Sequence, residues 1–324
     1  MGTYVIRRIL LAIPTVFVTL LLIFFMLRVL PGDAATAMLM GSTQGSQQGE
    51  IIPKATRDAV LKDLGLDKPI STQFVVYFWN VFHGDLGRSI YTNRSVWFEI
   101  GQRVPISLQV SLVALFMGLA FGIPIGVITA IKQDSIPDYL LRFFTILLLA
   151  IPSFWLGLMV LLIGAFVFNW MAPVGQHYLW VDPIMSLKQT MWPSLILASH
   201  STAVTARMTR STMLEVLRED YIRTARAKGL REQVVITRHA LRNSLIPVVT
   251  LAGLSFGNLL AGTVILEKVF TIPGMGLLFI NAIDSRDYAV VQAVVLIIAV
   301  SYVVVNLAVD LLYGWLDPRI SYAN

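Results

Sequence analysis

Residues Ile106–Ile131 read ISLQVSLVALFMGLAFGIPIGVITAI, and this stretch decides what kind of protein the chain forms. A helix needs about 20 consecutive apolar residues to cross the hydrocarbon core of a bilayer, and this run is longer. The composition points the same way. Of the 324 residues, 56% are hydrophobic and only 14% are charged, whereas a soluble domain carries about a quarter charged residues. We therefore expect an all-α, polytopic membrane protein.

Five further runs have the apolar character of membrane spans. The run after Trp192 is short and rich in serine and threonine, so it is the weakest of them. The first run follows Arg7 and Arg8 as a signal peptide would, but its apolar core exceeds the about 7–15 residues of such a peptide, which favours a retained helix. We expect six transmembrane helices. The runs are Ile9–Leu30, Ile106–Ile131, Tyr139–Phe168, Trp192–Ala206, Leu245–Leu266 and Tyr288–Leu312.

Positive charge gathers in one connection between these runs. Nine Lys and Arg residues lie in Arg207–Arg242, whereas one short external loop holds Lys188 and the other holds Lys268 and Arg286. Cytoplasmic loops are enriched in Lys and Arg, so both termini and Arg207–Ser244 are expected in the cytoplasm. The net charge of +6 then reflects basic loops beside membrane lipid, and no nucleic-acid partner is expected.

The spans divide the chain into three regions. Residues 1–30 form the cytoplasmic N-terminus and the first helix, 31–105 an external segment with short helices, and 106–324 a five-helix core with the cytoplasmic loop 207–244. In the external segment, Lys54–Leu64 is expected to form a short helix closed by Gly65. Phe74–Phe82 is apolar and aromatic but too short to span, so a helix at the outer interface is expected.

Three glycines mark one face of the second span. Gly118, Gly122 and Gly126 are four residues apart, and small residues at this spacing let another helix approach closely. We expect them to serve helix packing in preference to substrate contact. The sequence does not identify the partner helix.

Several classes of chemistry are excluded by the residues that the chain lacks. It has no cysteine, and its four histidines stand outside any short metal-binding spacing. No GxxxxGK[ST] loop or GxSxG elbow occurs, so neither a P-loop nucleotide site nor a hydrolase nucleophile is expected. Ionisable groups within the spans are few, with His200 and Asp310 the clearest, so any transport energy is expected to come from another chain. Candidate pathway residues are His200, Asn258 and Asn306.

The basic loop contains a short helical pattern. Asp220 is positioned to cap a helix Tyr221–Lys228, and Gly229 to end it in a left-handed turn. A second helix from Arg231 leads towards Pro247, which a helix tolerates in its first turn. The residues alone leave two interpretations open. One is an ordinary basic loop with incidental helicity, and the other is a helix whose small residues Thr224, Ala225 and Ala227 enter a groove on a partner.

Longer motifs resolve this choice by resemblance. The chain closely resembles the permease subunits of dipeptide/oligopeptide-type ABC importers over nearly its whole length. The motifs are RMTRSTMLEVL at Arg207–Leu217, EDYIRTARAKGL at Glu219–Leu230, HALRN at His239–Asn243, LIP at Leu245–Pro247, PGMG at Pro273–Gly276, RDY at Arg286–Tyr288, LPGD at Leu30–Asp33, HGDLG at His83–Gly87 and a tail from Asn306 to Arg319.

The resemblance implies a type I importer permease fold in a bacterial or archaeal inner membrane. It implies a second permease, two ATPase subunits that hold ATP and magnesium, and an external substrate-binding protein, with no catalysis and no cofactor in this chain. It also implies a coupling helix that sits in a cleft of the ATPase. The matching residues are Asp220, Tyr221, Ile222, Arg223, Thr224, Ala225, Arg226, Ala227, Lys228 and Gly229.

The chain departs from the wider importer pattern after this helix. Arg223–Ala225 stands where that pattern has EAA, and Pro247 falls eighteen residues after Gly229 where the pattern has thirteen. The departure leaves the helix boundaries after Gly229 open. Di- and oligopeptides are the cargo that the resemblance favours, with nickel chelates or oligosaccharides as alternatives. Two rival classes remain: an ATP-independent secondary transporter or channel, and an intramembrane enzyme, for which the sequence shows no reactive constellation.

Overall fold

The computed structural model describes residues 2–29, 62 and 67–316. The predicted loop motif Leu30–Asp33 and, apart from Lys62, the predicted helix Lys54–Leu64 lie outside these ranges. In chain order the elements are α1 (Gly2–Val29), α4 (Ile70–Phe82), α5 (Val96–Ile131), α6 (Ile136–Ala150), α7 (Ser153–Phe168), α8 (Pro183–Val216), α9 (Asp220–Ala227), α10 (Glu232–Val234), the π-helix η1 (Val235–Ala240), α11 (Leu241–Val269), α12 (Met275–Asp284) and α13 (Tyr288–Leu316).

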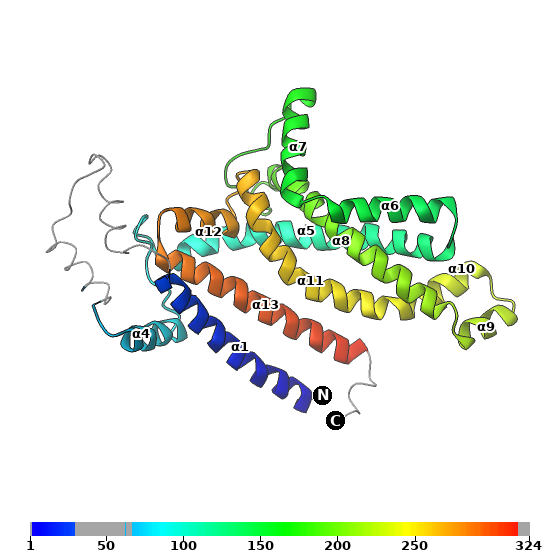
Figure 1. Ribbon diagram of the computed structural model, residues 1–324, viewed down its shortest axis with the longest axis horizontal. Helices are drawn as coiled ribbons and strands as arrows, with labels where there is room; N and C mark the ends of the chain where they lie inside the picture. Colours follow the sequence, from blue (N-terminus) through cyan, green and yellow to red (C-terminus); the bar gives the residue numbers. More distant parts are fainter. Residues whose placement is uncertain (1, 30–61, 63–66, 317–324) are drawn as a thin grey trace.

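Long helices run along the molecule and set its two ends. Figure 1 shows α9 and α10 at one end, and α4 and α12 at the other, with α5, α8, α11 and α13 between them. Among the residues that the structure describes, three helices are long and apolar enough to cross a membrane, and the pair α6–α7 makes a fourth if counted as one span. The all-α, polytopic expectation is therefore confirmed, while the count of six spans stays a prediction.

The pair α5 and α8 is held together at the three glycines. A Cβ placed on Gly122 would lie 2.6 Å from Thr205 Cβ, and one on Gly126 would lie 2.6 Å from the Ala206 carbonyl oxygen. Real carbon atoms in contact lie about 3.5–4.0 Å apart, so only glycine permits this approach. The partner helix that the sequence left unidentified is α8.

Helix α8 extends well beyond the predicted span Trp192–Ala206. It begins after Asp182, whose side chain accepts a hydrogen bond from the Met185 backbone N–H at 3.0 Å, and it continues to Val216. Its serines and threonines explain its weak apolar signal, because they face α5. The buried ones include Ser194, Ser201, Thr202, Thr205 and Thr209.

The predicted single span Tyr139–Phe168 is wrong as a continuous helix. It breaks at Ile151–Pro152, and α6 and α7 meet at 97°. The residue before a proline is pushed out of the α region, and Ile151 accordingly has an extended conformation. Helix α7 therefore turns away from the direction of α6, and its far end protrudes (Figure 1), while Leu156 and Val160 near its start pack against the core.

The helix before the fifth span also differs from its prediction. Residues Glu232–Val269 form one long helical segment that passes through η1, so Pro247 lies inside α11 and not in a first turn. The proline ring removes one backbone donor without ending the helix. The π-helical turns lie just before α11, where they join the short α10 to it.

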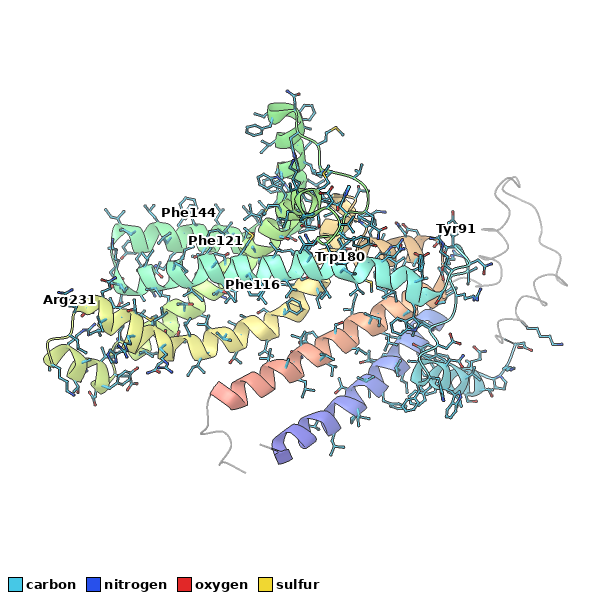
Figure 2. The ribbon with its side chains drawn as sticks, turned by 180° about the vertical axis from the view of Figure 1, so that it is seen from behind. Tyr91, Phe116, Phe121, Phe144, Trp180 and Arg231 are labelled. Atoms are coloured by element: carbon cyan, nitrogen blue, oxygen red, sulfur yellow. The ribbon has the colours of Figure 1, made fainter. Side chains whose placement is uncertain are left out.

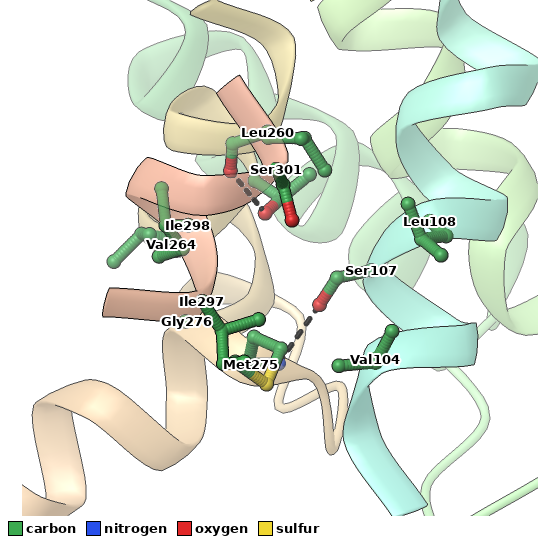
Figure 3. Close-up of a pocket in the computed structure, with 11 residues that line it drawn as sticks. Val104, Ser107, Leu108, Leu260, Val264, Met275, Gly276, Ile297, Ile298 and Ser301 are labelled. Atoms are coloured by element: carbon green, nitrogen blue, oxygen red, sulfur yellow. Dashed lines mark hydrogen bonds between the residues drawn. The ribbon is translucent and has the colours of Figure 1, made fainter. Parts of the chain in front are cut away.

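The end that carries α4 and α12 is fixed by buried polar contacts. Glu267 at the end of α11 accepts hydrogen bonds from the Ser107 hydroxyl at 2.6 Å and from the Gly276 backbone N–H at 2.7 Å. Ser107 in turn accepts from the Met275 backbone N–H at 2.8 Å, beside a cavity of about 50 Å³ (Figure 3). These bonds tie α5, α11 and the first turn of α12 together.

The described part of residues 31–105, the segment expected outside the membrane, is joined to the same end. The predicted interfacial helix Phe74–Phe82 is present within α4, whose Phe74 and Phe78 rings lie 6.2 and 5.6 Å from the Phe17 ring of α1. Further along, the Ser89 hydroxyl donates to the Asp287 carboxylate at 2.5 Å, and both residues are buried. Asp287 belongs to the RDY motif, so this motif anchors the chain around Ser89 to the start of α13.

Candidate functional site

Helix α9 lies where the sequence predicts a short helix, but Asp220 does not cap it. The capping position is Glu219, whose side chain makes no capping hydrogen bond, and Asp220 is the first helical residue. Its carboxylate is paired with Arg223 at 3.1 Å, and its backbone carbonyl accepts from the Thr224 hydroxyl at 2.9 Å. Asp220 therefore acts as an acidic residue in the first turn, where it suits the helix dipole.

The end of α9 is a Schellman turn. Gly229 has φ +75°, its N–H donates to the Arg226 carbonyl at 2.9 Å, and the Leu230 N–H donates to the Ala225 carbonyl at 3.4 Å. The left-handed conformation costs an L-residue about 1–2 kcal/mol, which glycine avoids. The predicted stop at Gly229 is confirmed.

One face of α9 is buried within the chain itself. Ile222 is 0% exposed and Ala225 is 7% exposed. They pack in a cluster with residues of α5, α8 and η1, so Ala225 does not face a groove on a partner as the sequence suggested. The other buried members of this cluster are Ala130, Met213, Val235 and Ala240.

The opposite face of α9 is open. Tyr221, Thr224, Ala227 and Lys228 are exposed, and the small Thr224 and Ala227 leave the helix backbone accessible between the larger side chains. The predicted small-residue surface therefore consists of Thr224 and Ala227 without Ala225.

Polar contacts fix α9 to the start of the long helical segment. The Arg226 guanidinium donates to the Glu232 carboxylate at 2.7 and 3.1 Å, and these hydrogen bonds raise the pKa of Arg226 above its ordinary value. The Asn243 side-chain amide donates to the Tyr221 hydroxyl at 2.8 Å. An exposed ion pair contributes little by itself, so the buried cluster is the main anchor and these bonds set the orientation.

The candidate pathway residues occupy three neighbouring helices without forming one site. His200 on α8 and Asn258 on α11 are exposed, while Asn306 on α13 is half-buried with an Oδ1 atom that has no hydrogen-bond partner. None of the three lines the cavity beside Ser107 or a larger cavity between α6 and α8. Asp310 lies within α13.

Two polar groups that the sequence reasoning missed are central to the structure. Asp138 is completely buried and lies 3.1 Å from both Arg142 on its own helix and Arg210 on α8. Glu267 is equally buried, in the network described above. The available signals were Asp138 beside Pro137 at the start of a span, and the acid Glu267 six residues before the PGMG motif. Among the described residues, no group of three or more acidic or histidine side chains is placed to hold a metal ion.

Comparison with family models identifies both parts of the chain. Residues 122–322 match the binding-protein-dependent transport system inner membrane component. Residues 1–112 match the N-terminal membrane component of binding-protein-dependent transport systems.

Relatives of known name match along the whole chain. The glutathione transport system permease protein GsiC of Pectobacterium atrosepticum is 38% identical, over 99% of this chain and all of that protein. The dipeptide transport system permease protein DppB of Escherichia coli K12 is 39% identical, over 98% of each chain. The di/tripeptide permease protein DppB of Pseudomonas aeruginosa is also 39% identical, over 99% of each.

Solved structures support the fold. An inward-facing structure of the MetNI methionine ABC transporter matches with a TM-score of 0.56 at 15% identity, over 68% of this chain and 97% of that one. At that identity the match bears on the fold alone, and it confirms the expected type I importer permease architecture.

Proposed function

The chain belongs to the family of inner-membrane components of binding-protein-dependent transport systems, as a multi-pass permease subunit of an ATP-binding-cassette importer, and from this premise we propose that α9 is the docking helix for a separate ATPase subunit. The proposed docking surface is the exposed face of α9, formed by Tyr221, Thr224, Ala227 and Lys228. The chain itself performs no covalent chemistry. ATP and magnesium belong to the partner ATPases.

The observation that carries this proposal is the position and the two-sidedness of α9. It is a separate short helix at the end of the molecule away from α4 and α12 (Figure 1), buried on one face and open on the other. An element held by its own chain yet exposed on a face with small side chains suits insertion into a cleft. A helix of eight residues is too short to be stable by itself. The burial of Ile222 on the inner face of α9 therefore holds the helix in place while the outer face stays open.

The connections of α9 suit it to transmit motion. Three residues, Leu217–Glu219, separate it from α8, and a short turn leads through α10 and η1 into α11. Because Ile222 and Ala225 are locked into a cluster shared with α5, α8 and η1, a displacement of α9 moves these helices with it. Rigid elements with packed interfaces convert such a displacement into a rigid-body movement between discrete states. Closure of the ATPases on ATP binding would thus move the spans, and hydrolysis would reset them.

The assembly that we propose contains a second, similar permease, two ATPases and an external substrate-binding protein. Both termini and residues 207–244 lie in the cytoplasm, because positive charge concentrates there. Residues 31–105 lie outside, with residues 106–324 as the core beside the pathway. Polar groups of His200, Asn258 and Asn306 are the candidates to line that pathway.

The cargo that we propose is a di- or oligopeptide. The named relatives are permeases for dipeptides, di/tripeptides and glutathione, and each matches over nearly the whole chain. Selectivity rests largely on the external binding protein, so that protein is the one to screen. A ligand present at 100 times its Kd stabilises its receptor by about 2.7 kcal/mol, which a thermal shift detects. Stabilisation by a non-peptide solute and by no peptide would refute this cargo.

The docking surface is tested by Ala227→Arg. Alanine and arginine have similar helix propensities, so the helix is retained while a long charged side chain blocks the open face. Loss of a central interface contact costs about 2 kcal/mol or more of binding free energy. We therefore expect the ATPase to bind the variant at least about 30-fold more weakly than the wild type, so that less ATPase co-purifies with it. Ala225→Arg is unsuitable, because Ala225 is buried within the chain.

The matched control is Ser285→Arg. It adds the same side chain at an exposed position at the end of α12, near the opposite end of the molecule. Both variants should reach the membrane and keep the thermal midpoint of the wild type. Equal ATPase retention by the two variants would show that α9 is not the docking element.

A further inference from the structure

A second cavity lies between α6 and α8, with α5 behind it. Its volume is about 520 Å³, within the range of small-molecule sites in proteins, which is about 300–1,000 Å³. Thr129 of α5 and Thr145 of α6 are among the residues that line it. It lies towards the end of α8 that leads into α9.

Four arginines line this cavity. Arg142 projects from α6, Arg207 and Arg210 from α8, and Arg218 from the turn after α8. Positions 207 and 210 share one face of α8, and the turn after α8 brings Arg218 to the same cavity. Planar guanidinium groups bind phosphate oxygens in a bidentate manner, which makes such a cluster suited to a phosphate group.

The acids nearby neutralise only part of this charge. Asp138 is paired with Arg142 and Arg210, each at 3.1 Å. Glu215 also lines the cavity. Arg207 and Arg218 have no acidic side chain within 4.0 Å in the part of the chain that the structure describes. The cavity thus keeps a surplus of two positive charges.

The wall of the cavity continues into an apolar outer surface. Ile146 lines the cavity and is 65% exposed, and Phe143 and Phe144 on the same helix are 61% and 55% exposed. Figure 2 shows Phe144 on α6, and Phe116 and Phe121 on the neighbouring α5. A basic recess beside an exposed apolar helix face matches a lipid, whose phosphate enters the recess while its chains cover the helix.

We propose that the cavity between α6 and α8 is a binding site for the phosphate headgroup of an anionic phospholipid of the inner leaflet. Basic recesses between transmembrane helices on the cytoplasmic side hold such headgroups, and each nearby arginine strengthens the attraction. The bound lipid joins α6 to the end of α8, directly before α9. Occupancy therefore sets the position of the helix from which α9 extends, and this conclusion about regulation rests on the proposed docking function.

The site is tested by lipid binding to the assembled transporter, delipidated and held in phosphatidylcholine. Short-chain phosphatidylglycerol is titrated in, and the shift of the thermal midpoint reports binding. We expect Arg207→Gln with Arg218→Gln to bind about 25-fold more weakly, about fivefold for each arginine removed. Replacing the same two arginines by lysine keeps the charge and should restore most of the affinity.

The matched control is Arg231→Gln with Arg238→Gln, which removes two exposed cations outside the cavity. Affinity as weak in this control as in the variant with Arg207→Gln and Arg218→Gln would show bulk attraction without a built site, and would overturn the proposal. Unchanged affinity in the latter variant would overturn it as well.

A second titration with inorganic phosphate distinguishes the source of the phosphate group. Saturation by inorganic phosphate with no response to phosphatidylglycerol would overturn the lipid assignment. These measurements do not depend on ATPase retention, so their failure and the failure of the docking proposal are distinguishable.

Discussion

Replacement of Gly118 by alanine should separate α5 from α8 at a single point. A Cβ at Gly118 would lie 2.7 Å from Ser201 Cβ, whereas the nearest backbone atom of Ser201 would lie 3.4 Å away. Two carbon atoms in contact lie about 3.5–4.0 Å apart, so the two helices must move by roughly 1 Å. Because Ser201 Cβ is fixed to its backbone, a rotamer change cannot relieve this overlap. Overpacking of this kind costs about 1–3 kcal/mol.

Gly101→Ala is the reference for this change. Gly101 lies on the same helix, and nothing stands within 4 Å of the position that its Cβ would take. Both substitutions gain the same helix propensity, about 1 kcal/mol, so this term cancels in the comparison. We expect Gly118→Ala to be about 1–3 kcal/mol less stable than Gly101→Ala.

A double-mutant cycle in mixed-micelle unfolding measures the contact. Ser201→Gly removes the obstructing Cβ, so Gly118→Ala combined with Ser201→Gly should recover most of the loss that Gly118→Ala causes alone. Gly126→Ala offers no such rescue, since its Cβ would also meet the Ala206 carbonyl oxygen at 2.6 Å. Equal stability of Gly118→Ala and Gly101→Ala, or no coupling with Ser201→Gly, would refute this account of the α5–α8 contact.

Two buried acids lead to further predictions. Glu267→Ala leaves the Ser107 hydroxyl and two backbone N–H groups of α12 without their acceptor, which should lower the free energy of unfolding by about 3 kcal/mol. Amide hydrogen exchange in α12 should become faster relative to α13, and unchanged exchange would contradict the network. Asp138→Asn leaves the partly buried Arg210 without its counter-charge, which should lower the free energy of unfolding by about 1–3 kcal/mol and so lower the thermal midpoint. The control Asp284→Asn, at an exposed position, should leave the thermal midpoint unchanged.

The local chemistry of the candidate site was predictable because it depends on neighbouring residues. The helix expected at Tyr221–Lys228 is found at Asp220–Ala227, and Gly229 ends it in the expected conformation. Its cap was predicted wrongly, since Asp220 and Glu219 are adjacent acids and the sequence does not decide which of them starts the helix. The sequence could not show that Ala225 is buried within the chain, because the cluster that holds it draws Met213 and Val235 from other elements.

For the spans too, the sequence predicted the local helices but not how they bend and pack. The apolar runs marked the helices that cross the molecule, but Pro152 inside one run produced a 97° bend that the length of the run concealed. That proline was a visible signal, and it was outweighed by the apolar residues on both sides. The long α8 was underestimated for the opposite reason, because serines and threonines that face α5 lower its hydropathy without ending the helix.

The sequence by itself determined the class of the protein, its principal apolar helices and the stop of α9 at Gly229, because these follow from composition, from helical spacing and from the conformational freedom of glycine. The tertiary structure alone decided that the three glycines of Ile106–Ile131 meet α8, and which face of α9 is free. It alone brought Arg142 of α6 beside Arg210 of α8 around one buried carboxylate. Contacts between distant segments depend on how the helices pack, and no local pattern in the chain encodes that packing.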